Sequence, residues 1–425
     1  MRIEAIYRGI RRSACLAALL TLAILFPCAS HALSLEEALK LALENNPAIK
    51  ASRTQISQNK AQEITAGLRP NPLLSWDAQF IPIFHPSQFS TNTLDTAQQF
   101  DIGAGYLIER GGKRMRRLDA ARETTQVTEA NIADLERTLR YDVAQQFLAA
   151  LLAQSDLEFA RAALDSFQET VKINQDRFQS GDISRNDFLI IKLQLLQFQN
   201  DVNAARLARV QALTNLRQLI GYDAVPAGYD VEGKLECVPI KARLEDLQAL
   251  ALKQRPDLLA SELGITAAQG QVALAKANAR QDLNVTFDYS HVSQTSSGSL
   301  FFNIPLAIFN RNQGEIARTR FARTQAELTR QAAEQTVLTD VRNAFEGIKS
   351  NQEIVSLYES GYLKDAADSR EISEYAYRQG AAALLDFLDA ERTYRATQIA
   401  YRQALASYML ALEQLRQATG TRSLP

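Results

Sequence analysis

The 425-residue sequence predicts a mainly α-helical chain that is built as a tandem repeat and carries two pairs of β-strands. Three observations predict this fold class: residues of the first half recur in the second, two segments per half alternate apolar and polar residues, and long segments lack proline. The recurrence is the most specific, because a constant offset through identical residues indicates a duplication. Eight residues return 199 positions later: Gly181, Asp187, Phe188, Leu189, Leu216, Arg217, Gln218 and Gly221 match Gly380, Asp386, Phe387, Leu388, Leu415, Arg416, Gln417 and Gly420.

The first 32 residues predict a cleaved secretory signal. Arginines precede the apolar run 14–26, and a small-residue site ends at Ala32. A membrane anchor is a weaker alternative, because the run is shorter than the roughly 20 residues that a spanning helix needs. Lipidation of Cys28 is a second alternative, disfavoured by the rigid Pro27 before it. The mature chain is therefore expected to begin near Leu33 and to be exported.

Composition argues against several classes of function. Export leaves Cys237 as the only cysteine, so no internal disulfide is expected. The formal net charge of −1 shows no basic surplus for nucleic acid. His85 and His291 are the only mature histidines, and the sequence has no nucleophile motif, phosphate loop or Cys/His metal spacing. No catalytic residue, bound metal or cofactor is predicted, and the chain is not expected to be an enzyme.

The two repeats predict the same order of elements. Ser34 and Glu37 have the spacing of a capping box at the first helix. The first repeat, residues 33–221, is expected to hold a helix at 35–68, strands at 73–83 and 98–109, and helices at 113–179 and 183–220. The second repeat, residues 244–420, is expected to hold a helix at 245–280, strands at 283–292 and 299–308, and helices at 313–379 and 382–419. A linker of proline and glycine, 222–243, joins them, and 421–425 is a tail.

The strands each have one apolar and one polar face. Leu74, Trp76 and Phe80 alternate with polar residues, as do Phe287 and Tyr289 in the second repeat. Such strands suit a half-buried soluble sheet or a barrel in the outer membrane. Four strands cannot close a barrel, because the smallest membrane barrels have about eight. If these strands span a membrane, several chains must combine them, and three chains would supply twelve.

The helices after each strand pair are unusually long. A helix over 113–179 would measure roughly 100 Å, which is too long for one lobe of a compact globule. Leu157, Leu164, Val171 and Phe178 recur every seven residues, which predicts packing as coiled coils. A spectrin-like bundle or a cytoplasmic coiled coil is the alternative, but it explains neither the signal nor the strands.

Several stretches together resemble the TolC-type outer membrane efflux protein family over essentially the whole mature chain. They are LSLEEALKLALENNP, the RPDL at 255–258, IPLAIFNRNQGEIA at 304–317, FQSGDIS at 178–184 and YRQGAAALLDFLDA at 377–390. The GGKR at 111–114, with FNRNQGEIA, is similar to the CzcC-like branch that serves heavy-metal resistance pumps.

The resemblance implies a channel-tunnel protomer of a homotrimer, with a 12-stranded barrel in the lipid of the outer membrane and a 12-helix tunnel through the periplasm. Residues 222–243 would form an equatorial segment. The implied partners are a periplasmic adaptor (membrane fusion) protein and an inner membrane pump of the RND type, and the implied cargo is heavy-metal cations. Drug efflux and type I protein secretion are alternatives, and a non-conducting periplasmic scaffold or adaptor is the alternative from another class.

The resemblance also assigns residues at the periplasmic end. Gly181 and Gly380 would form the tips that meet the adaptor, together with Leu189 and Leu388. A plain helical turn that requires glycine is the alternative, and the Asp-Phe-Leu that follows each glycine at the same spacing favours recognition. Asp386 and Asp389 lie three apart on one helix face and match residues that form an anionic constriction. Asp187 and Tyr377 match positions that hold the helices shut. Ala382 stands where some members have arginine, so Arg185 or Arg378 is the expected substitute in that latch.

Overall fold

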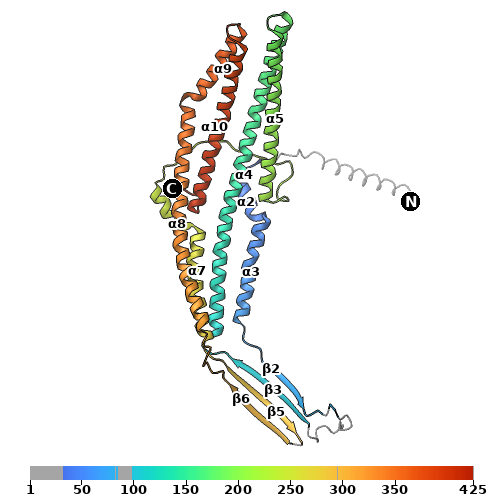
Figure 1. Ribbon diagram of the computed structural model, residues 1–425, viewed down its shortest axis with the longest axis vertical. Helices are drawn as coiled ribbons and strands as arrows, with labels where there is room; N and C mark the ends of the chain where they lie inside the picture. Colours follow the sequence, from blue (N-terminus) through green and yellow to red (C-terminus); the bar gives the residue numbers. More distant parts are fainter. Residues whose placement is uncertain (1–31, 82, 85–97, 294, 425) are drawn as a thin grey trace, which may run out of the picture. The chain divides into compact units, whose positions relative to one another are not determined.

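The computed structural model describes residues 32–81, 83–84, 98–293 and 295–424 (Figure 1). The predicted signal peptide lies outside these residues up to position 31. Within the described part, no helix is both long enough and apolar enough to cross a membrane. The chain divides into two units. We call residues 1–46, 142–237 and 354–410 the turn unit, and residues 47–141, 238–353 and 411–425 the sheet unit.

The turn unit contains the two helical turns and the helices beside them (Figure 1). A short parallel pair joins β1 (Ala32–Leu33) to β4 (Asp230–Val231). The helices are α2 (Leu35–Asn45), the second part of α4 (Lys113–Ser180), α5 (Arg185–Ile220), α9 (Leu363–Arg378) and most of α10 (Leu384–Thr419). The predicted capping box is present, because the Glu37 side chain accepts from the Ser34 backbone and Ser34 Oγ accepts from Glu37 N.

The core of the turn unit brings both repeats together. Its buried side chains come from four helices: Phe167, Ile191, Phe198, Tyr377, Leu384 and Phe387. The rings of Phe167 and Phe198 stack at 4.4 Å between centroids. Leu164 and Val171 of the predicted heptads pack against this cluster. The α4–α5 and α9–α10 hairpins are therefore fixed to each other by one apolar core.

The sheet unit holds a four-stranded antiparallel sheet in the order β2-β3-β5-β6. Its strands are β2 (Leu73–Gln79), β3 (Gln99–Ile108), β5 (Leu283–Val292) and β6 (Thr295–Asn303). Its helices are α3 (Pro47–Gly67), the first part of α4, α6 (Leu244–Gln254), α7 (Pro256–Asn278), most of α8 (Gln313–Leu357) and the end of α10. The strand pairs of the two repeats join at β3 and β5, so β2 and β6 are left as edges.

One face of this sheet is apolar and exposed. Register places Trp76 opposite Ile102, and Ile102 opposite Tyr289. These three side chains are 72%, 49% and 42% exposed, and Leu300 beside them is 58% exposed. A continuous apolar face is unusual on a surface that meets water, and it is typical of an interaction surface or a membrane-facing one.

The structure corrects several predicted boundaries. The single helices expected at 35–68 and 245–280 are each two helices, broken before Pro47 and Pro256. Proline disfavours the α conformation of the residue before it, and Asn46 and Arg255 accordingly have ψ values of 121° and 122°.

Three further boundaries differ. The predicted strand 299–308 is wrong by several residues, because β6 ends at Asn303, before Pro305. The predicted strand 73–83 ends at Gln79. The predicted helix 313–379 is interrupted by a π-helical turn, Tyr358–Tyr362, where Gly361 has a φ of 148°.

The residue before each of these prolines contacts a backbone carbonyl at the end of a long helix. Asn46 Nδ2 donates to the carbonyl of Leu219 at 2.8 Å, near the end of α5. Arg255 Nη1 contacts the carbonyl of Ala418, the position 199 residues later, at 3.4 Å. Orphan carbonyls at a helix end need such donors. Each break therefore caps the last turn of the long helix of its own repeat.

Candidate functional site at the two helical turns

The first turn joins α4 to α5 through a glycine in left-handed geometry. Gly181 has a φ of 86°, which a residue with a Cβ rarely adopts. The Asp182 N–H donates to the Arg177 carbonyl at 2.8 Å, and the Gly181 N–H donates to the Phe178 carbonyl at 3.2 Å. These bonds satisfy carbonyls that the end of α4 would leave free.

The second turn has the same backbone. Gly380 has a φ of 72°, the Ala381 N–H donates to the Ala376 carbonyl at 2.9 Å, and the Gly380 N–H donates to the Tyr377 carbonyl at 3.1 Å. A Cβ built on either Gly181 or Gly380 would meet no heavy atom within 4 Å. Backbone conformation, not crowding, therefore requires glycine at both turns.

The first aspartate of the helix that follows each turn lies in a capping position. Ser184 Oγ accepts from the Asp187 N–H at 3.1 Å and donates to Asp187 Oδ2 at 2.8 Å. In the second repeat, Asp386 Oδ2 accepts from the Ala383 N–H at 3.2 Å. Asp187 and Asp386 therefore stabilise the starts of α5 and α10, where the helix dipole also favours a negative charge.

Asp389 lies one helical turn after Asp386 and is paired. Arg392 Nη2 lies 2.6 Å from Asp389 Oδ1, with the two side chains 79% and 61% exposed. An exposed pair of this kind contributes little to stability. The structure therefore brings Asp386 and Asp389 onto an exposed surface and adds a cation, Arg392, that was not among the residues predicted for this site. Arg392 follows Asp389 by three residues, a spacing that predicts an ion pair on one face of a helix.

Each turn is closed by a pair of stacked aromatic rings. Phe178 and Phe188 stack at 5.1 Å between centroids with 6° between planes. Tyr377 and Phe387, both 199 positions later, stack at 5.5 Å with the same 6°. The pairs differ in exposure: Phe178 is 36% exposed, whereas Tyr377 is 6% and Phe387 is 2% exposed.

Tyr377 forms a hydrogen bond between the two repeats. Its hydroxyl donates to Asn174 Oδ1 at 2.7 Å, and Asn174 Nδ2 donates to the Thr170 carbonyl at 2.8 Å. The guanidinium carbon of Arg177 lies 5.2 Å from the centre of the Tyr377 ring. Burial raises the pKa of Tyr377; the Arg177 charge opposes this shift and the Asp187 charge adds to it. The hydroxyl is therefore a neutral donor held in a buried site.

The predicted latch residues are only partly brought together. The hydroxyl of Tyr377 bonds to Asn174, while the carboxylate of Asp187 bonds to Ser184. Arg378 pairs with Glu374 along its own helix, and Arg185 is exposed. Leu189 is 48% exposed, whereas Leu388 packs against the core of the turn unit. Asn174 was missed, because nothing in its local sequence marks a polar partner 203 positions away.

A group of charged side chains, of which Glu391 is buried, lies next to this core. Arg395 pairs with Asp201 and lies 4.0 Å from the centre of the Phe198 ring. Glu391 is 9% exposed, and Arg370 Nε lies 3.5 Å from its Oε2. Burial raises the pKa of Glu391, and the charges of Arg370 and Arg395 oppose that shift. The sequence analysis missed this group as well.

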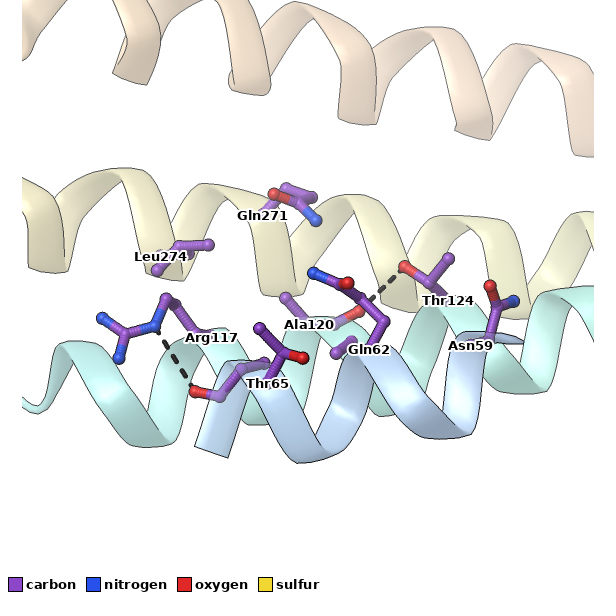
Figure 2. Close-up of a pocket in the computed structure, with 10 residues that line it drawn as sticks. Asn59, Gln62, Thr65, Arg117, Ala120, Thr124, Gln271 and Leu274 are labelled. Atoms are coloured by element: carbon purple, nitrogen blue, oxygen red, sulfur yellow. Dashed lines mark hydrogen bonds between the residues drawn. The ribbon is translucent and has the colours of Figure 1, made fainter. Parts of the chain in front are cut away.

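A separate cavity of about 380 Å³ lies in the sheet unit among α3, α4 and α7, as Figure 2 shows. Its lining combines amide and hydroxyl side chains with three alanines and Leu274. At Arg117, the Nε atom donates to the Ala66 carbonyl at 3.4 Å. Arg117 is also paired with Glu109. The lining includes no carboxylate or imidazole. In the described residues, no group of three or more His, Cys, Asp or Glu could hold a metal ion.

Comparison with known proteins identifies the family. The sequence profile described as "Outer membrane efflux protein" matches residues 38–222 and 247–421. The chain belongs to the outer membrane efflux protein family. It is therefore an efflux channel of the outer membrane and not an enzyme, and the recognition made from the sequence is confirmed.

Individual relatives agree with this assignment. The chain is 26% identical to the cobalt-zinc-cadmium resistance protein CzcC of Cupriavidus metallidurans, over 88% of this chain and 86% of that protein. It is 25% identical to the pyoverdine export outer membrane protein OpmQ of Pseudomonas aeruginosa, over 91% and 85%. A crystal structure of CusC aligns with a TM-score of 0.76 at 20% identity, covering 91% of this chain and 92% of that one. The mainly helical fold with few strands is therefore shared with known channel proteins.

Proposed function

We propose that this channel exports heavy-metal cations as the outer membrane component of a tripartite efflux system. The observation that carries the proposal is the similarity to CzcC across 88% of the chain, since the name of that protein assigns it to cobalt, zinc and cadmium resistance. The export of pyoverdine named for OpmQ, at nearly the same identity, favours a second candidate, a channel for larger organic molecules.

The proposed channel is a homotrimer. The sheet of one chain has four strands and leaves β2 and β6 as unpaired edges. Unpaired strand edges cannot remain in lipid, because every backbone polar group there must be bonded within the protein. Three chains that join β2 to β6 would close twelve strands, with the exposed apolar face of Trp76 and Leu300 toward the lipid. The long helices would then form the periplasmic tunnel.

The proposed contacts with a periplasmic adaptor lie at the two turns. Gly181 and Gly380 are exposed and have open space around them. Leu189 adds an exposed apolar side chain beside the first turn, whereas Leu388 would act by supporting the second. An inner membrane pump of the RND type is the proposed source of the cargo.

The proposed gate is a ring of Asp386 and Asp389 from three chains. Six carboxylates around a narrow bore would attract cations, because low-dielectric walls focus their field. Changing both residues to alanine is expected to weaken cation selectivity and block by divalent ions together, in single-channel recordings. The control is Asp182→Ala, which removes an exposed carboxylate at the first turn that belongs to neither the proposed ring nor the proposed latch. Selectivity and block identical to wild type in the double variant would remove the ring from this proposal.

The test of cargo is metal accumulation in a host that lacks its own outer membrane channel and carries the cognate pump and adaptor. Supplying this chain is expected to lower cellular cobalt, zinc and cadmium several-fold. A panel of organic efflux substrates in the same cells separates the second candidate. Lower accumulation of organic substrates with no change in metals would contradict the metal proposal and leave the channel assignment intact.

A further inference from the structure

A pocket lined by four arginines lies at the end of α10 in the sheet unit. We call it the arginine pocket; it has a volume of about 310 Å³. Arg137 and Arg140 come from α4, Arg416 comes from the last turn of α10, and Arg422 comes from the segment after it. This pocket has no part in the proposed gate, cargo or adaptor contacts.

The carboxylates around the arginine pocket are fewer than its guanidiniums. Of the described residues that line the pocket, Glu413 alone carries a carboxylate, and it is 5% exposed. Its Oε2 lies 3.1 Å from Arg422 Nη1, and its Oε1 pairs with Arg416. One buried carboxylate is therefore shared between two arginines, and the buried Nε of Arg416 has no hydrogen-bond partner among the described residues.

The other two arginines have partners outside the pocket. Arg137 pairs with Asp134 at 2.7 Å and donates to the Gln417 carbonyl at 2.7 Å. The carboxylate beside Arg140 is Glu136 at 4.0 Å, and Glu136 already lies 2.7 Å from Arg53. Arg140 is therefore only weakly neutralised, and its side chain is 39% exposed.

The equivalent place in the first repeat has no such cluster. Arg217 matches Arg416, but its Nη2 donates to the carbonyls of Tyr222 at 2.8 Å and Val225 at 3.1 Å. Thr214 and Asp223 stand at the positions that match Glu413 and Arg422. The first repeat thus uses its arginine on its own backbone, and the cluster of four arginines lies at the end of the second repeat.

We propose that the arginine pocket binds an oxyanion, a phosphate or a carboxylate group. The planar guanidinium presents paired donors that match these groups, and the volume is at the lower end of the range for small-molecule sites. The C-terminus of α10 opposes an anion with about half a negative charge. This repulsion by the helix end is weaker than the attraction of the guanidiniums, because Arg137 and Arg255 already donate to the carbonyls of Gln417 and Ala418.

The test uses thermal unfolding of the full-length protein in detergent, titrated with sodium phosphate and with sodium chloride at equal ionic strength. Phosphate is expected to raise the unfolding temperature saturably, beyond the effect of chloride. Arg416→Gln is expected to weaken phosphate binding at least tenfold, and Arg140→Gln severalfold. Arg217→Gln, at the matched position of the first repeat, is expected to bind phosphate as wild type does.

The Arg140→Gln variant keeps the test decisive if Arg416→Gln fails to fold, because Arg140 is 39% exposed and its contact with Glu136 is long, at 4.0 Å. Equal effects of phosphate and chloride, or unchanged phosphate affinity in Arg140→Gln and Arg416→Gln, would overturn the proposal.

A competing titration distinguishes the sources of the anion. A short peptide with a free C-terminal carboxylate, of the kind that cell-wall peptides carry, is compared with its amide. Tighter binding of the acid than of phosphate would assign the pocket to a carboxylated peptide, and weaker binding would assign it to free phosphate. Loss of metal export has no bearing on either outcome, because the site does not depend on the cargo.

Discussion

The two helical turns share one backbone but differ in the surroundings of their aromatic pairs. In the stacked pair of the first repeat Phe178 is exposed and Phe188 is half-buried, whereas Tyr377 and Phe387 stack inside the core that joins the repeats. The same contrast holds one turn later, where exposed Lys192 of the first repeat matches buried Glu391 of the second. The backbone of the turn and the stacking of the rings are therefore the same in both repeats. Only the pair in the second repeat is buried, and that pair holds the two hairpins together.

The largest effect is expected from removing a ring of the buried pair. Phe387→Ala would leave a cavity in the core of the turn unit, which costs about 3–5 kcal/mol. Phe188→Ala, the matched change in the first repeat, is expected to cost less, about 1–2 kcal/mol, since Phe188 is only half-buried and loses only part of the burial free energy of a core ring. Thermal unfolding in detergent measures both. Equal losses would show that the two turns do not differ in the way proposed here.

Removing the hydroxyl of Tyr377 is expected to have the next largest effect. Tyr377→Phe keeps the stack but leaves buried Asn174 Oδ1 without its donor, which costs about 1–3 kcal/mol. Because the bond joins the two repeats, we also expect a higher open probability in planar bilayers. Asn174→Ala should match Tyr377→Phe, and the double variant should add little to either. Fully additive effects would contradict a shared bond.

The buried carboxyl of Glu391 predicts a dependence of stability on pH. Its pKa is raised by burial from the ordinary 4.5, so the folded state binds a proton more readily than the unfolded state. Stability is therefore expected to fall as pH rises from about 4.5 through the raised pKa. Glu391→Gln should flatten this part of the profile and stabilise the protein more at pH 7 than at pH 4.5. Lys192→Gln is the matched control, and an identical profile in Glu391→Gln would exclude Glu391 as the source.

The smallest effect on stability is expected at the turn glycines. Gly181→Ala and Gly380→Ala each meet open space, so each should cost only about 1–2 kcal/mol of backbone strain. Co-purification with the adaptor and metal export are measured beside unfolding temperature. Loss of adaptor binding with intact assembly supports recognition at the turns, whereas normal binding in both variants would leave them as plain helical turns.

Features that depend on neighbours in sequence could be predicted from the sequence. The glycine turns, the capping box at Ser34 and the alternation of the strands rest on contacts between residues at most five positions apart or on burial of one face. The breaks at Pro47 and Pro256 were also within reach, because proline restricts the residue before it. The apolar period continues across each proline, so the period alone predicts one helix where the structure has two.

The sequence by itself determined the repeat, the class of fold, the family and the positions of the two turns, because duplicated residues and short-range backbone preferences are written in the order of the chain. Only the tertiary structure decided which aromatic pair is buried, that Tyr377 bonds to Asn174, and that Glu391 lies among Arg370 and Arg395. These contacts form only when helices that are far apart in the sequence pack side by side. Neither the burial of a side chain nor its hydrogen bond to a distant residue produces a periodic pattern in the sequence around it.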